Sequence, residues 1–208
     1  MNKNQRIKTI EMTELAILTA IVLVLQLTGT AIKLTGLGTS ISLVLIPIVL
    51  GAVLLGPGAG AWLGFTFGAV TYFMGVFGLD AFTNILFNAH PFLTALICFG
   101  KGICAGLAAG LLYRAFEKFN PYVAATVAAA AAPIVNTGLF ILGGLTMTDT
   151  LKVNFADGAG VSVIYFLIMI CAGINFLFEL ALNLILSPGI YRVSLIVKKS
   201  IHKNMTHI

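Results

Sequence analysis

The chain has 208 residues, of which 59% are hydrophobic and only 9% are charged, and its formal net charge is +5. Soluble domains carry about 25% charged residues, so this composition indicates a polytopic membrane protein. The length leaves room for about six membrane-crossing helices and none for a separate soluble catalytic domain. We therefore expect one all-α membrane domain over residues 1–208. The basic residues lie at the expected membrane edges, which argues against a nucleic-acid partner.

Apolar runs separated by Gly, Pro and charged residues predict the membrane spans. The first run follows basic residues but is not followed by a small-residue cleavage site, so it is interpreted as a membrane helix and not as a signal peptide. The sequence LGPGAG, Leu55 to Gly60, predicts a tight turn between the second and third spans. Several glycines in the third span predict a short or irregular helix. The six expected spans are 12–30, 40–56, 59–78, 92–114, 121–145 and 161–190.

Charge predicts the orientation of these spans. Lysine and arginine gather before the first span, between the fourth and fifth spans, and after the last span. The opposite side has only Lys33 and Lys152. By the positive-inside rule both termini are cytoplasmic, and the loops 31–39, 79–91 and 146–160 face outward.

Small residues recur every four positions in two of the expected helices. The fourth span carries Gly102, Gly106 and Gly110, a spacing that lets helix backbones approach closely in lipid. We expect these glycines to pack within the chain. Ala16 and Ala20 of the first span have the same spacing near the cytoplasmic end, where either intramolecular packing or a partner subunit can use them.

Lys101 and Glu179 are the two acid or base side chains well inside the expected spans. An ionisable group at membrane depth is a functional hypothesis, provided that its partner is named. Their depths differ by roughly 7 Å, a gap that two long side chains can close. One interpretation is thus a Lys101–Glu179 ion pair. The other is a water-filled cavity in which Lys101 binds an anionic ligand.

Amide side chains at similar depth favour the cavity. Asn136 lies nearly level with Lys101, and Pro133 and Gly138 predict a loosened helix around it. In the last span, polar residues recur every four positions and form one stripe: Asn175, Glu179 and Asn183. A single asparagine more often joins two helices than binds a ligand.

The expected outer loop 79–91 has two interpretations. Its Asn84, Asn88 and His90, together with nearby aromatic residues, fit a lid that orients and covers a ligand. They also fit an interfacial loop with aromatic rings at the headgroup level.

Catalytic and metal-binding patterns are missing from the sequence. The three cysteines and three histidines are scattered, and HExxH, Walker and paired-carboxylate motifs do not occur. We expect no enzyme activity, metal or cofactor, although a small intramembrane enzyme remains a formal alternative.

The pattern as a whole resembles a known family. Six helices, a short N-terminal segment, AxxxA in the first helix and GPxxG after the second are similar to the substrate-binding S component of energy-coupling factor (ECF) vitamin transporters. The stretches that most resemble its pantothenate-specific members are SLVLIPIVLGAVLLGPGAG, NAHPFLTALICFGKGICAGLAAGLLYR, PIVNTGLF and NFLFELALNLILSP.

This resemblance implies a prokaryotic plasma-membrane protein that captures a vitamin outside and delivers it through a transmembrane T subunit and two cytoplasmic ATPases. Ala16 and Ala20 match the motif that docks on the T subunit. Lys101, Asn136 and Asn175 lie on helices that form the family's ligand pocket, and Glu179 would support or pair with Lys101. Pantothenate, a small anion with hydroxyls and an amide, fits these groups. Riboflavin, folate or biotin, and a non-transporting assembly or sensor protein, are the alternatives.

Overall fold

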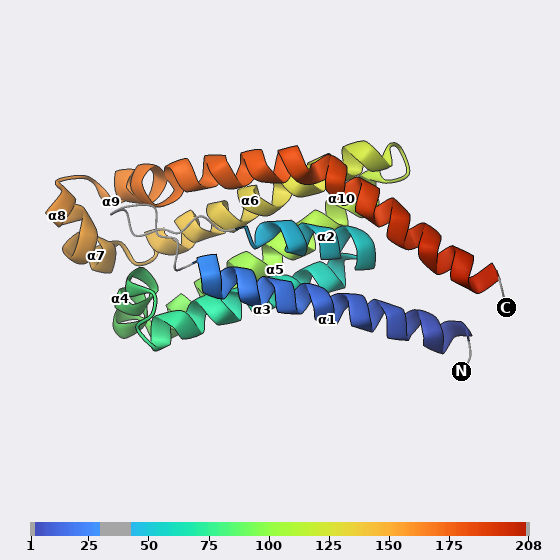
Figure 1. The fold of residues 1–208 in the computed structure, drawn as a ribbon. Helices are drawn as coiled ribbons and strands as arrows, with labels where there is room; N and C mark the ends of the chain where they lie inside the picture. Colours follow the sequence, from blue (N-terminus) through green and yellow to red (C-terminus); the bar gives the residue numbers. More distant parts are fainter. Residues whose placement is uncertain (1–2, 30–42, 207–208) are drawn as a thin grey trace.

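The computed structural model describes residues 3–29 and 43–206, and every regular element in those ranges is helical (Figure 1). The expected loop 31–39, with Lys33, lies outside the described residues. The long elements are α1 (Lys3–Gly29), α2 (Leu45–Leu55), α3 (Pro57–Val76), α5 (Pro91–Phe116), α6 (Pro121–Leu145) and α10 (Ile174–Thr206). The short ones are α4 (Ala81–Ala89), α7 (Thr148–Leu151), α8 (Asp157–Ala159), α9 (Val163–Tyr165) and two π-helical segments, η1 (Lys152–Ala156) and η2 (Phe166–Gly173).

Five helical segments are long and apolar enough to cross a membrane: Gln5–Gly29, Pro57–Val76, Pro91–Phe116, Pro121–Leu145 and Val163–Val197. The second expected span differs, because α2 has 11 residues. At a 1.5 Å rise per residue it is about 17 Å long, roughly half of a hydrocarbon core of about 30 Å. Residues 40–42 of that expected span lie outside the described residues.

The last helix is longer than the expected 161–190. The helical segment runs through Pro188 and continues past Arg192, because no turn signal follows Gly189 and charged residues by themselves do not end a helix. The expected outer loops also prove to be partly helical: α4 occupies most of 79–91, and α7, η1 and α8 occupy most of 146–160.

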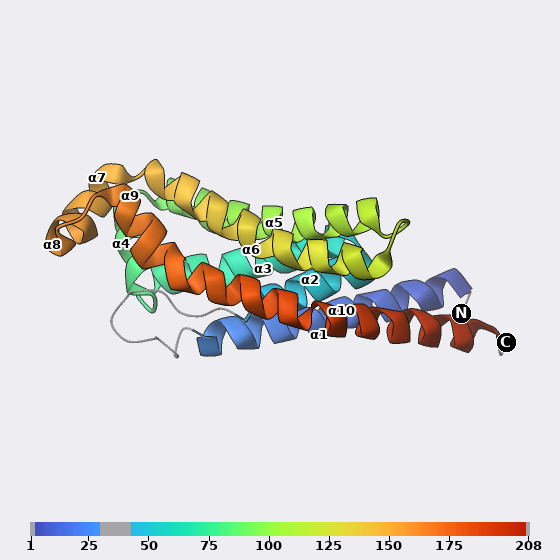
Figure 2. The same ribbon diagram turned by 90° about the horizontal axis from the view of Figure 1, so that it is seen from above.

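The two ends of the molecule differ in composition. The described ends of α1 and α10 lie together at one end, and α4, α7, α8 and α9 lie at the other (Figures 1 and 2). The turn between α5 and α6 lies toward the end with the termini, so the expected basic clusters share that end.

The turn between α2 and α3 forms as the sequence predicts. Helix α2 ends at Leu55, Gly56 adopts a φ of 98°, and Pro57 is the first residue of α3. A positive φ is accessible to glycine at little cost, and proline suits the first helical turn because its nitrogen has no hydrogen to leave unpaired.

Helices α3 and α5 pack with their backbones in direct contact. A Cβ on Gly102 would meet the Gly64 carbonyl oxygen, and a Cβ on Gly106 would meet that of Gly60. The expectation that the α5 glycines pack within the chain is confirmed. The expectation of a short or irregular third helix is wrong, since α3 is one helix of 20 residues whose glycines face α5.

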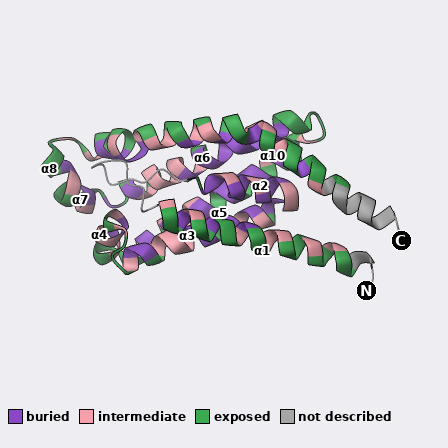
Figure 3. Ribbon diagram, viewed as in Figure 1, coloured by how far each residue is buried: buried purple, intermediate pink, exposed green. Residues whose placement is uncertain are grey.

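The buried residues lie mainly in the middle of the bundle (Figure 3). The alanines of α6 that face α2, α5 and α10 form one apolar cluster near the end with the termini: Ala124, Ala125, Ala128, Ala129 and Ala132. Helix α1 is mostly exposed, and both Ala16 and Ala20 are on its exposed surface.

Candidate functional site

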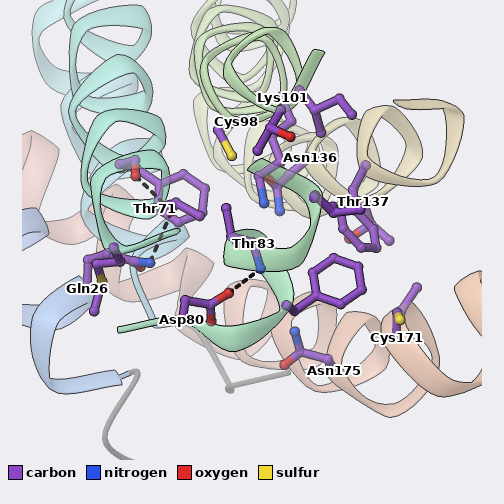
Figure 4. A pocket seen from close by; sticks show the side chains of 18 of the residues that line it. Gln26, Thr71, Asp80, Thr83, Cys98, Lys101, Asn136, Thr137, Cys171 and Asn175 are labelled. Atoms are coloured by element: carbon purple, nitrogen blue, oxygen red, sulfur yellow. Dashed lines mark hydrogen bonds between the residues drawn. The ribbon is translucent and has the colours of Figure 1, made fainter. Parts of the chain in front are cut away.

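A cavity of about 140 Å³ lies in the half of the bundle that contains α4 (Figure 4). One water molecule needs roughly 10–15 Å³ of such a cavity volume, so the cavity has room for about ten waters or one small molecule. Residues from α1, α3, α4, α5, α6, η2 and α10 line it, together with the Asp80 cap of α4. The lining is Gln26, Phe67, Thr71, Met74, Asp80, Phe82, Thr83, Leu86, Thr94, Ile97, Cys98, Lys101, Asn136, Thr137, Phe140, Cys171, Ala172, Asn175, Phe176 and Glu179.

Lys101 enters this cavity from α5. Its Nζ lies 5.3 Å from the ring centroid of Phe67 and 5.4 Å from that of Phe140. Glu179 lines the same cavity and is 3% exposed. The Lys101 ammonium thus faces two aromatic rings and shares the cavity with the Glu179 carboxylate. Both charges therefore belong to one cavity that a ligand can occupy.

Asn136 of α6 also lines the cavity, so its expected association with Lys101 holds geometrically (Figure 4). It is 8% exposed, and its Oδ1 is buried with no hydrogen-bond partner among the described residues. Helix α6 continues through Pro133, which has no N–H to donate to the carbonyl of Ala129. Buried polar atoms without a partner are rare in proteins and call for a water or ligand.

Helix α10 supplies Asn175 and Glu179, one turn apart on the cavity side. The Oδ1 of Asn175 has no hydrogen-bond partner among the described residues. Asn183 continues the stripe but is not in the cavity lining; it is 1% exposed, and its Nδ2 donates to the Glu179 carbonyl over 2.8 Å. The preceding η2 segment is π-helical, a geometry that often occurs at functional sites.

Helix α4 lies against the cavity and contributes Phe82 and Thr83 to its wall. The helix begins at the Asp80 cap, whose carboxylate accepts from the Thr83 N–H over 2.7 Å. An acceptor at this position pairs one of the otherwise unpaired N–H groups of the first turn. Asp80 thereby fixes the α4 backbone beside the cavity.

Three of the expected ligand residues lie elsewhere. Asn84 donates its Nδ2 to the Gly75 carbonyl over 2.7 Å, and Asn88 donates to Asn84 Oδ1 over 3.2 Å. His90 is exposed at the junction of α4 and α5. These side chains are outside the cavity lining because residues 81–89 form a helix whose Phe82, Thr83 and Leu86 face inward instead.

Sequence reasoning missed several polar residues of the lining. Gln26 of α1 donates to Thr71 of α3 over 3.1 Å, and Thr94 and Thr137 add hydroxyls from α5 and α6. Gln26 is a single amide side chain among apolar residues near the outer end of its helix, and this pattern could have marked it as a cavity residue. Threonines in membrane helices often bond their own backbone, as Thr94 bonds the His90 carbonyl, so their sequence positions alone give no such signal.

The cavity can bind a small polar molecule by one cationic contact, several hydrogen bonds and aromatic cover. Its ionisable lining groups are the Lys101 ammonium, the carboxylates of Asp80 and Glu179, and the thiols of Cys98 and Cys171. Within the described ranges, no three His, Cys, Asp or Glu side chains are grouped closely enough to hold a metal ion.

Comparison with known proteins gives one result of consequence. The comparison with curated proteins returned no match. The family model described as "ECF transporter, substrate-specific component" matches residues 11–191. This match includes three of the five apolar segments in full, most of the first and the last, and all residues that line the cavity. The chain is a multi-pass membrane protein that belongs to the family of substrate-specific components of ECF transporters.

Proposed function

We propose that this chain captures pantothenate at the outer face of a prokaryotic plasma membrane and delivers it to an ECF transport complex. The observation that carries the proposal is the convergence of Lys101, Asn136, Asn175 and Glu179 in one cavity. These residues come from three helices and are far apart in the sequence. Their convergence is typical of a binding site that orients a ligand by a few polar groups within apolar walls.

Pantothenate has groups that complement this lining. Its carboxylate suits the Lys101 ammonium, and its hydroxyl and amide hydrogens suit acceptors such as Asn175 Oδ1. A charge pair at membrane depth must overcome the desolvation of both ions, so the neighbouring amides are required as additional partners. Riboflavin is uncharged and does not need the lysine. Biotin and folate carry carboxylates, so the charge of the site does not separate them from pantothenate.

The topology that we propose has both termini in the cytoplasm and six segments within the membrane, with α2 only partly crossing it. The support is the position of the cavity, which lies in the half of the bundle away from the termini (Figures 1 and 4). Basic residues lie at the end with the termini, as the positive-inside rule requires.

The partners that we propose are a transmembrane T subunit and two ATPases. Members of this family are substrate-binding subunits, so ATP hydrolysis belongs to the other chains. Ala16 and Ala20 support docking through α1, because both are exposed on the side of the bundle and allow a second helix to approach closely.

The test is a thermal-shift panel of B vitamins with the purified chain in detergent. A ligand present at 100 times its dissociation constant should raise the unfolding free energy by about 2.7 kcal/mol. We expect stabilisation by pantothenate and an affinity at least tenfold lower for Lys101→Ala, which corresponds to about 1.4 kcal/mol. A shift with riboflavin alone contradicts the assignment of the vitamin, and no shift with any vitamin contradicts the proposed function.

A further inference from the structure

Two phenylalanines from different helices contact the ammonium group of Lys101. Phe67 of α3 and Phe140 of α6 place their rings 5.3 and 5.4 Å from Lys101 Nζ, measured to the ring centroids. Helices α3 and α6 both pack against α5, which carries the lysine. We call Phe67 and Phe140 the aromatic clamp.

Each ring of the clamp is held by further packing. Phe67 is 4% exposed and belongs to the apolar cluster formed by α1, α2 and α3. Phe140 packs against Phe82 of α4, with ring centroids 5.9 Å apart. The rings are therefore positioned by the fold and do not depend on the lysine.

The physical effect of the clamp is electrostatic and entropic. An aromatic face attracts a cation within about 6 Å, and the attraction grows when water is excluded. A lysine side chain has four rotatable bonds and, when free, loses much of its freedom on binding an anion. A lysine held in advance loses less, so the same carboxylate binds more tightly.

We propose that Phe67 and Phe140 are positioning residues that hold the Lys101 ammonium in the cavity and thereby set the preference for a carboxylate ligand over an uncharged analogue. The ligand in this inference is taken from the proposed function, whereas the contacts of the two rings with Lys101 are present without a ligand. Two experiments therefore test the positioning of Lys101 and the vitamin assignment separately.

The first experiment needs no ligand. In protein labelled with ¹³C-lysine, the Lys101 Hε signals are assigned by their loss in Lys101→Arg. Aromatic ring currents should move these signals upfield of the other lysines. Phe140→Leu should reduce the upfield shift, and Phe140→Tyr, which keeps the ring face, should retain it. Lys101 signals that coincide with those of the other lysines in the unmodified protein would overturn the clamp.

The second experiment measures a ratio of affinities. Pantothenate and pantothenol differ by a carboxylate against an uncharged alcohol, so their affinity ratio reports the contribution of the charge. We expect Phe140→Leu to reduce this ratio about tenfold and Phe140→Tyr to restore it. Phe99→Leu is the matched control: Phe99 is on α5 and packs on Phe65 at 5.3 Å, outside the cavity lining. Its ratio should be that of the unmodified protein.

The outcomes distinguish the two claims. If the unmodified protein binds pantothenate and the ratio is unchanged in Phe140→Leu, the clamp is wrong and the proposed function stands. If no vitamin binds but the Lys101 signals respond to Phe140→Leu as expected, the positioning of Lys101 is supported and the vitamin assignment fails. Phe67→Tyr and Phe67→Leu repeat the comparison for the buried ring, and Phe140 decides the result if Phe67→Leu does not fold.

Discussion

The close backbone contact between α3 and α5 can be tested quantitatively by substituting two nearby glycines of α5. Gly102 and Gly100 are two residues apart on α5. A Cβ on Gly102 would meet the backbone oxygen of Gly64 and lie 3.3 Å from the Phe67 ring, whereas a Cβ on Gly100 would have no atom within 4 Å. The same substitution, Gly→Ala, therefore enters a closed contact at one position and open space at the other.

The expected difference follows from two terms. Replacing a mid-helix glycine by alanine favours the helix by about 0.5–1 kcal/mol, and this term is common to both variants. Overpacking costs about 1–3 kcal/mol and applies only to Gly102→Ala, because a backbone carbonyl cannot rotate away as a side chain can. Gly102→Ala should therefore be less stable than Gly100→Ala by about 1–3 kcal/mol, which for a chain of this size is a Tm difference of roughly 2–12 °C.

The assay is thermal unfolding of both variants in the same detergent, followed by vitamin titration. Affinity should fall in Gly102→Ala, because separating α3 from α5 moves Phe67 away from Lys101. It should be unchanged in Gly100→Ala. A Tm for Gly102→Ala equal to or above that of Gly100→Ala would refute the close backbone packing on which the reasoning depends.

Three further predictions concern the cavity and the docking surface. Asn136→Leu should keep the fold, because Asn136 Oδ1 has no partner among the described residues, and should weaken pantothenate binding at least fivefold in calorimetric titration; unaltered affinity would remove Asn136 from the site. Asp80→Ala removes the cap of α4 and should destabilise that helix by about 1 kcal/mol, seen as faster amide hydrogen exchange in 81–89 but not in α6; equal exchange would contradict the capping role. Ala20→Trp should abolish co-purification with the co-expressed T subunit and ATPases without changing vitamin affinity, and Ala115→Trp, at an exposed alanine of α5, is the control. A complex that survives Ala20→Trp would exclude the α1 surface as the docking site.

The sequence predicted the long helices well because apolar length and turn residues are local properties. The boundaries 121–145 agree with α6, and the Gly56–Pro57 turn formed as expected. The third helix was misjudged, since glycine lowers helix propensity in isolation but permits packing when a second glycine helix lies opposite. That pairing is a tertiary property, and the sequence of α3 alone does not contain it.

The site was partly predictable for a related reason. Lys101, Asn136, Asn175 and Glu179 stand out because polar groups are costly at membrane depth, and all four line the cavity. Phe67 and Phe140 gave no signal, since phenylalanine is ordinary in an apolar helix and acquires a role only from the lysine beside it. The prediction that Asn84, Asn88 and His90 face a ligand treats the segment as a loop, whereas residues 81–89 form a helix that directs Phe82 and Leu86 to the cavity instead.

The cavity lies between two tightly packed apolar clusters of the interior. One apolar cluster, around the α6 alanines, lies toward the termini, and another joins Leu86, Met147, Leu151 and Phe166 at the opposite end. Between them, polar side chains from the first and last helices face a space with no protein atoms to complete the packing. A ligand bound there as proposed would contact Lys101 of α5 and Asn175 of α10 at the same time. Ligand binding would then stabilise the packing of these helices against one another. A change in vitamin occupancy should therefore change the unfolding free energy of the whole bundle.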